Sequence, residues 1–147
     1  MAMAERRAQV VWQGDLSNGR GRVTVGSGAF SEFEITWASR TQRSEGKTSP
    51  EELIAAAHGG CFSMALSAEL TEAGLTPESL EVQATVSLDE VDGVPTVVSS
   101  ALTVNARARG LTPEQLREAA EKAKEGCPVS RALKGNIEIS VSALVVE

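Results

Sequence analysis

The sequence predicts an α+β fold that forms a single domain over residues 1–147. Short alternating apolar segments in the first third are typical of strands, and two later segments carry helix start and stop signals. Strands are expected before, between and after these two helices. Because hairpin signals join neighbouring strands, we expect antiparallel sheets rather than a doubly wound parallel sheet.

Three strands are expected before the first helix. Residues 8–13 form an apolar run, and the Asn18-Gly19 pair that follows is a strong hairpin signal. Polar and apolar residues then alternate over 22–25 and again over 33–37, which is typical of half-buried strands.

Residues 38–48 are expected to form a polar loop that carries two arginines, Arg40 and Arg43. Loops of this length usually have a functional or interfacial reason. A helix is expected to follow, from Pro50 to about residue 73. Its start is marked by an N-cap serine, a proline at the first helical position and a capping-box glutamate, and Gly74 ends it.

One stripe of this helix combines small and apolar residues. Its members are Leu53, Ala57, Gly60, Cys61, Met64 and Ala68. The adjacent Gly59 and Gly60 lower helix stability by roughly 2 kcal/mol relative to two alanines. We therefore expect another element to pack closely on this stripe, with the stripe buried at the centre of the fold.

The second half of the chain is expected to contain three more strands and one more helix. Residues 81–90 and 96–107 read as strands, joined by a hairpin signal at residues 92–93. A second capping pattern predicts a helix over 112–125. We expect a short turn over 129–134 and then a last alternating strand at 137–141.

Charge and composition argue against several classes of partner. The chain has 14 basic and 20 acidic residues and a net charge of −6 at pH 7, which predicts no nucleic-acid partner and no anionic membrane partner. No apolar run approaches the roughly 20 residues of a membrane span. Residues 1–7 carry no apolar signal-peptide segment, and we expect a cytoplasmic protein.

Reactive side chains are scarce, since the chain has two cysteines and one histidine. Multi-histidine and four-cysteine metal sites are therefore excluded. Cys61 lies in the first helix beside two glycines that leave it accessible, and Cys127 follows the second helix directly before Pro128. Two inert buried thiols are the common alternative, and His58 is expected as a partly buried or interface residue. A reactive thiolate needs a nearby cation, which an arginine of the 38–48 loop would supply.

Two longer motifs surround the cysteines. Residues 49–66 read SPEELIAAAHGGCFSMAL, and residues 124–130 read KEGCPVS. These motifs resemble the first- and second-cysteine motifs of the osmotically inducible protein C and organic hydroperoxide resistance family (OsmC/Ohr). Residues 12–15 and 88–89 also fit, so the resemblance covers nearly the whole chain. The HGGCFSM form is more similar to the OsmC branch than to the Ohr branch.

The resemblance implies a non-haem, two-cysteine peroxidase that reduces organic hydroperoxides in oxidative and osmotic stress defence, with hydrogen peroxide as a second candidate substrate. It implies that Cys61 attacks the peroxide and that Cys127 resolves the sulfenic acid as a disulfide, which an external dithiol reduces. Glu51 matches the family's glutamate ten residues before the first cysteine. Arg40 matches its arginine best, with Arg43 as the alternative. No metal and no organic cofactor are implied.

The resemblance also implies an OsmC-like fold in which a long central helix carries Cys61, and an intertwined homodimer. The spacing gives an independent reason for a shared site, because ten helical residues separate Glu51 from Cys61 by roughly 15 Å along the axis and roughly 80° around it. Either the loop folds far along the helix so that Arg40 bridges the gap, or Glu51 and Arg40 come from the partner chain. We expect the partner chain. The alternatives are a non-enzymatic redox-sensing or binding homodimer, and a metal protein that uses Cys61, Cys127 and His58, with fewer ligands than a closed zinc site needs.

Overall fold

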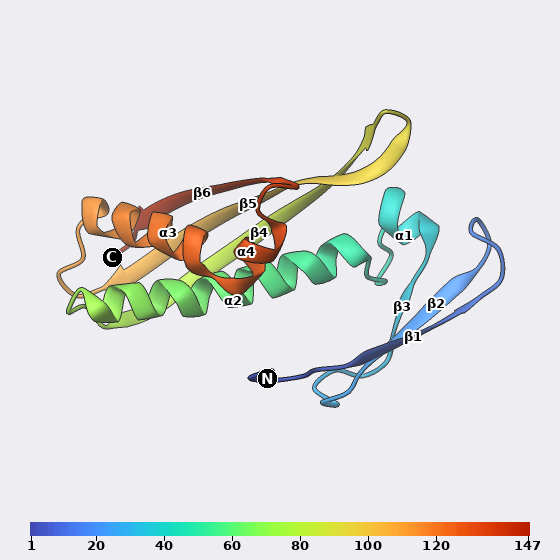
Figure 1. The fold of residues 1–147 in the computed structure, drawn as a ribbon, viewed down its shortest axis with the longest axis horizontal. Coiled ribbons are helices and arrows are strands. Elements are labelled where there is room, and N and C mark those ends of the chain that lie inside the picture. Colours follow the sequence, from blue (N-terminus) through green and yellow to red (C-terminus); the bar gives the residue numbers. More distant parts are fainter. The chain divides into compact units, whose positions relative to one another are not determined.

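The computed structural model describes residues 1–147 and divides the chain into two compact units, Met1–Leu53 and Ile54–Glu147. The first unit contains a three-stranded antiparallel sheet in the order β1-β2-β3 (Figure 1). Its elements are β1 (Ala8–Gln13), β2 (Arg20–Val25), β3 (Phe33–Ile35) and the short helix α1 (Trp37–Thr41). The β1–β2 hairpin confirms the predicted turn, in which a side chain at Gly19 would collide with the Asp15 carbonyl.

The second unit contains a three-stranded sheet in the order β4-β5-β6, accompanied by helices (Figure 1). Its elements are α2 (Pro50–Glu72), whose first turn belongs to the first unit, β4 (Pro77–Val91), β5 (Val94–Ala108), α3 (Pro113–Gly126), α4 (Pro128–Leu133) and β6 (Glu138–Val145). The β4–β5 turn confirms the second predicted hairpin. Asp92 and Gly93 have φ values of 51° and 81°, the left-handed conformation that a two-residue hairpin of this kind requires.

The core of the second unit is formed by α2, β5 and α3. Phe62, Leu66 and Leu70 follow one another at four-residue intervals on α2, so they share one face, and all three are fully buried. They belong to one cluster with buried residues of the other two elements: Leu102, Val104, Ala106, Leu116, Ala119, Ala120 and Ala123. This cluster fixes the face of α2 that points into the unit.

Strand β6 corrects the expectation of antiparallel sheets. β4 and β5 are antiparallel, but β6 runs parallel to β5. The chain between β5 and β6 contains two helices, and a parallel pair requires a crossover of this type. Hairpin signals report only strands that follow each other directly, so they carried no information on this pairing.

Two segments that were expected to be irregular are helical. α1 begins at Trp37, which was assigned to the third strand, and it includes Arg40, which was assigned to a loop. The expected turn at 129–134 is largely helix α4, with Cys127 as its N-cap and Pro128 at its first position. These helices have five and six residues, which is too short for a helical periodicity to be visible in the sequence.

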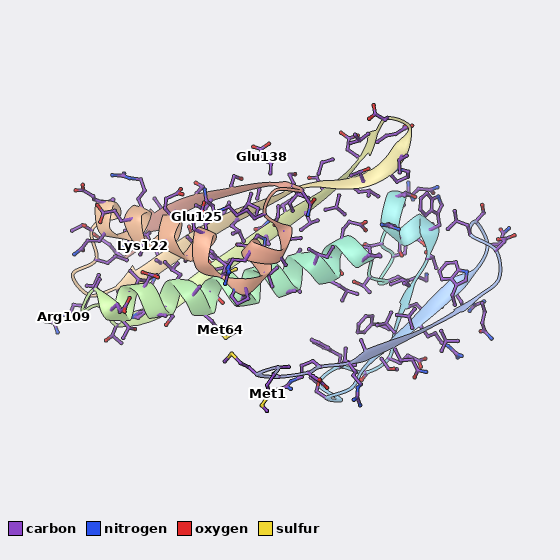
Figure 2. All side chains as sticks on the ribbon, viewed as in Figure 1. Met1, Met64, Arg109, Lys122, Glu125 and Glu138 are labelled. Carbon is purple, nitrogen blue, oxygen red and sulfur yellow. The ribbon has the colours of Figure 1, made fainter.

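The small-residue stripe of α2 is not buried within the chain, contrary to the prediction. Met64 is 72% exposed, and its side chain points away from the β4-β5-β6 sheet (Figure 2). A Cβ atom at Gly60 would meet no neighbouring atom within 4 Å, and one at Gly59 would contact only Val82 and Ala84, each at 3.9 Å. The helix therefore presents an accessible, closely approachable face around Gly60.

Helix α2 is also the one helix that is long and apolar enough to cross a membrane by length and composition alone. No single apolar run in the sequence had indicated this. Core helices of globular proteins satisfy the same criterion, so it is weak evidence for a membrane span. Only 22% of the most apolar part of α2 is buried within the chain.

The first unit has almost no core of its own. Val23 is its only buried apolar side chain, and every residue of β1 is exposed. Three of these β1 residues are large and apolar, namely Val10, Val11 and Trp12, with exposed fractions of 53%, 43% and 40%. Such a unit buries too little apolar surface to be stable by itself.

Candidate active site

In the first unit, Arg40 and Glu51 form a close ion pair. The Arg40 Nε donates to both carboxylate oxygens of Glu51, at 2.8 Å and 3.2 Å, and the Arg40 Nη2 lies 2.7 Å from Oε1. The Glu51 side chain is only 9% exposed, whereas that of Arg40 is 32% exposed. Several hydrogen bonds to one buried carboxylate fix the orientation of the guanidinium. Since arginine has five N–H donors, the pair leaves some of them for a ligand.

Local structure on both sides of the pair holds it in place. Thr36 and Ser39 form a reciprocal capping box at the start of α1, with both bonds at 2.9 Å. The Ser39 hydroxyl also lies 2.8 Å from the Thr48 carbonyl oxygen, which ties α1 to the segment before α2. The Arg40 guanidinium lies 5.9 Å from the centre of the Trp37 ring, within cation–π distance.

Arg43, the alternative arginine, lies just after α1 and is exposed. Its backbone N–H donates to the Ala38 carbonyl at 3.0 Å, but its side chain forms no ion pair. The geometry therefore favours Arg40 over Arg43 as the oriented guanidinium.

In the second unit, the two cysteines lie together. Cys61 on α2 is partly buried, and the Val129 backbone N–H donates to its sulfur at 3.5 Å. Cys127 is fully buried and caps α4. Its own N–H donates to the Ala123 carbonyl at 2.9 Å, so it also ends α3. Both thiols are free, and the Cys127 side chain lies within hydrogen-bonding reach of Cys61, so two residues that are distant in the sequence are neighbours.

The Cys61 thiol is not activated by the groups around it in this unit. Burial raises the pKa of Cys61 most, the Val129 N–H lowers it, and the Cys127 side chain raises it further. None of these groups is a cation, so the low pKa expected for a reactive thiolate is not reached with them alone.

A buried hydrogen-bonded chain leads from β5 to Cys127. His58 is fully buried, with Nδ1 2.6 Å from the Ser100 hydroxyl and Nε2 2.8 Å from the Ser130 hydroxyl. The Cys127 thiol donates to the same Ser130 hydroxyl at 3.2 Å, and the Ser130 N–H donates back to the sulfur at 3.3 Å. Burial lowers the pKa of His58, which keeps its ring neutral at pH 7.

The sequence had suggested a partly buried or interface position for His58, whereas the side chain is fully buried, and it gave no role to the two serines. In the structure, the imidazole instead connects to Cys127 through Ser130. The only signal in the sequence is the position of Ser130, three residues after Cys127, where the side chain of an N-cap residue finds its backbone partner. Nothing in the sequence pointed to Ser100.

Two adjacent free thiols, which can exchange between dithiol and disulfide, are typical of thiol-dependent redox proteins. The family described as OsmC-like protein matches residues 43–142. Peroxiredoxin OsmC of Escherichia coli (strain K12) is 41% identical over 134 residues, which are 91% of this chain and 93% of that protein. The organic hydroperoxide resistance protein OhrB of Bacillus subtilis is 32% identical over 123 residues, 82% of this chain and 87% of that protein. The chain therefore belongs to the OsmC family.

The crystal structure of OhrB from Bacillus subtilis has the same fold. It aligns with a TM-score of 0.76 and 25% sequence identity, over 97% of this chain and 99% of that one. The α+β fold expected from the resemblance to OsmC and Ohr proteins is thereby confirmed, with two small sheets and four helices.

Proposed function

We propose that this protein is a thiol-dependent peroxidase that reduces organic hydroperoxides to alcohols in defence against hydroperoxide stress. Relatives named peroxiredoxin and organic hydroperoxide resistance protein support a hydroperoxide-reducing activity. The observation that carries the proposal is the pair of free thiols, of which Cys61 is accessible and Cys127 is buried next to it. A peroxide needs an accessible sulfur to attack it, and disulfide formation needs a second sulfur within reach.

In the first half of the proposed reaction, the Cys61 thiolate attacks one peroxide oxygen. An S–O bond forms and the O–O bond breaks, so that the alkoxide leaves, takes up a proton and becomes the alcohol, while Cys61 becomes a sulfenic acid. Arg40 would stabilise the thiolate and donate a hydrogen bond to the peroxide oxygen. Glu51 would hold the guanidinium in that orientation, as their ion pair supports.

In the second half, the Cys127 sulfur attacks the sulfur of the Cys61 sulfenic acid. The S–S bond forms, the S–O bond breaks, and water is the product. An external dithiol then reduces the disulfide through a mixed-disulfide intermediate, which returns both cysteines to thiols. The cytoplasm is the compartment that we propose, because its reductants keep such thiols reduced.

We further propose that Arg40 and Glu51 serve Cys61 of a partner chain in an intertwined homodimer. α2 runs without interruption from Pro50 to Glu72, so helix geometry separates Glu51 from Cys61 by roughly 15 Å along its axis and roughly 80° around it. The groups that set the pKa of Cys61 include no cation. A second copy of the chain would supply one.

Two uncovered apolar surfaces support a homodimer. One is the face of α2 around Gly60 and Met64, where small residues allow close approach. The other is β1, which is exposed along its whole length in a unit with almost no core. Exposed apolar surfaces of this kind mark protein–protein contacts. With a partner covering both, residues 1–147 would act as a single OsmC-like domain.

Steady-state peroxide consumption tests the proposed function. With a dithiol donor present, the purified protein is expected to consume many equivalents of an alkyl hydroperoxide per chain and to release the alcohol. Parallel assays with hydrogen peroxide and with several dithiols identify the preferred substrate and reductant. A redox sensor of the same fold would consume a single equivalent per chain and stop, and that result would contradict a peroxidase.

The two arginines are expected to differ in their effect on the peroxide step. Arg40→Ala should slow Cys61 oxidation by roughly 100-fold, the loss typical of removing one oriented donor, and should raise the pKa of Cys61 because a nearby cation is lost. Arg43→Ala is the matched control and should react at the parental rate, since Arg43 is exposed and unpaired. Stopped-flow oxidation and the pH dependence of thiol alkylation measure both effects. Equal, small effects would mean that neither arginine serves the thiol.

A further inference from the structure

We propose that Ser130 and His58 form a buried proton relay that deprotonates Cys127 for disulfide formation. The inference rests on the peroxidase chemistry proposed above and concerns its second half. A thiol attacks sulfur only as the thiolate, so the Cys127 proton must leave before the S–S bond forms. Because Cys127 is fully buried, bulk water cannot accept that proton directly.

The hydrogen-bond directions along the chain define the relay. The Cys127 thiol donates to the Ser130 hydroxyl oxygen at 3.2 Å, so the single hydroxyl proton of Ser130 is free to point to His58 Nε2 at 2.8 Å. Nε2 is then the unprotonated nitrogen of a neutral ring. The proton is on Nδ1, which donates to the Ser100 hydroxyl at 2.6 Å. In this tautomer the Ser100 hydroxyl oxygen accepts from Nδ1, and Nε2 is free to accept a proton from Ser130.

The relay moves two protons in one step. The Cys127 proton moves to the Ser130 oxygen as the Ser130 proton moves to His58 Nε2, which leaves a Cys127 thiolate and an imidazolium. The backbone N–H of Ser130 donates to the Cys127 sulfur at 3.3 Å and stabilises the thiolate. The thiolate attacks the Cys61 sulfur, the S–O bond of the sulfenic acid breaks, and the departing hydroxide recovers the proton as water. Ser130 contacts the reacting sulfur, and His58 acts through it.

Other groups around the relay are poorly suited to accept this proton. On α2 the Cys61 thiol is the electrophile once oxidised, and none of the helix's four glutamates, Glu51, Glu52, Glu69 and Glu72, is hydrogen-bonded to the His58 ring. From β5, the Ser100 hydroxyl contacts the ring. Ser130 also borders a cavity of about 160 Å³ that is lined by Lys124, Glu125 and Lys134. The Glu125 carboxylate is paired with Lys134 at 2.9 Å, and this pairing lowers the pKa of Glu125, so it is a weaker base than a neutral imidazole. Burial lowers the pKa of His58, and no neighbouring charge lowers it further.

The relay can be tested without any peroxide. The Cys61 thiol of the full-length protein is converted to a mixed disulfide with thionitrobenzoate, whose release on attack by Cys127 is followed by its absorbance. We expect Ser130→Ala and His58→Asn to slow this release by roughly 100-fold at pH 7, within the range for loss of a general base. Ser130→Thr keeps the hydroxyl and should retain most of the rate. Val104→Ala, a core substitution away from the relay, controls for general destabilisation.

The pH profile separates a relay from a purely structural role. The parent rate should be flat above the lowered pKa of His58 and should fall below it, because a protonated ring accepts no proton. The Ser130→Ala rate should instead rise by about tenfold per pH unit, as the thiolate must then form without the relay. A flat Ser130→Ala profile at the parental rate would overturn the relay, as would an equal loss in Val104→Ala. Because this assay uses no hydroperoxide, failure of the peroxidase proposal appears separately, as an absence of peroxide turnover.

Discussion

Cys61→Ser is expected to reduce hydroperoxide consumption to the uncatalysed background, whereas Cys127→Ser is expected to consume one equivalent per chain and then stop. The serine hydroxyl is not ionised near neutral pH and cannot replace the thiolate that attacks the peroxide. In Cys127→Ser, Cys61 still forms its sulfenic acid, but the neighbouring sulfur that would remove it is absent. Continued exposure to peroxide should then carry Cys61 on to the sulfinic acid.

Steady-state turnover with a dithiol, together with trapping of the sulfenic acid by a 1,3-dione, measures both outcomes. Each variant exchanges one sulfur for one oxygen, so each is a control for the folding of the other. Normal cycling of Cys127→Ser with a dithiol would mean that the reductant attacks the sulfenic acid directly, and Cys127 would then not be the resolving residue.

Local signals in the sequence predicted most of the fold. The two hairpins and the capped starts of α2 and α3 depend on a few adjacent residues, and the structure contains all four. The parallel pairing of β6 and the exposed face of α2 depend on contacts between distant segments. Adjacent glycines in α2 correctly indicated room for close approach, but they could not indicate that nothing within the chain occupies it.

The candidate site also combines residues that local motifs indicated with residues that only the fold brings together. Cys61, Cys127 and Glu51 lie in motifs that resemble those of the family, and Arg40 was matched to the family's arginine by its position after residue 37, with Arg43 as the alternative. The structure pairs Arg40 with Glu51 and brings the two cysteines together. The serines of the relay could not be predicted, because their roles arise only where α2, β5 and α4 meet. A serine on a strand has no local pattern that separates it from other polar strand residues.

Heterodimers of two damaged chains are expected to regain up to half of the parental activity. In a Cys61→Ser chain paired with an Arg40→Ala chain, a site shared between subunits combines the intact Cys61 of one with the intact Arg40 of the other. The second site combines both substitutions and is dead. The expectation follows from the helical separation of Glu51 from Cys61 and from the raised pKa of Cys61 among its own neighbours. Differently tagged, co-purified heterodimers are compared with each mutant homodimer.

A second, reciprocal heterodimer places both substitutions in one chain and is expected to give the opposite outcome. Its expected result is a loss of activity, so the test does not depend on measuring a partial recovery. When the parent chain is paired with a chain that carries both Cys61→Ser and Arg40→Ala, shared sites predict almost no activity. The only intact Cys61 then faces a partner without Arg40. Sites complete within one chain predict half of the parental activity for this pair and none above the homodimers for the first pair. The two arrangements therefore give opposite rankings of the same two heterodimers, and a more active reciprocal heterodimer would contradict a site built across the homodimer.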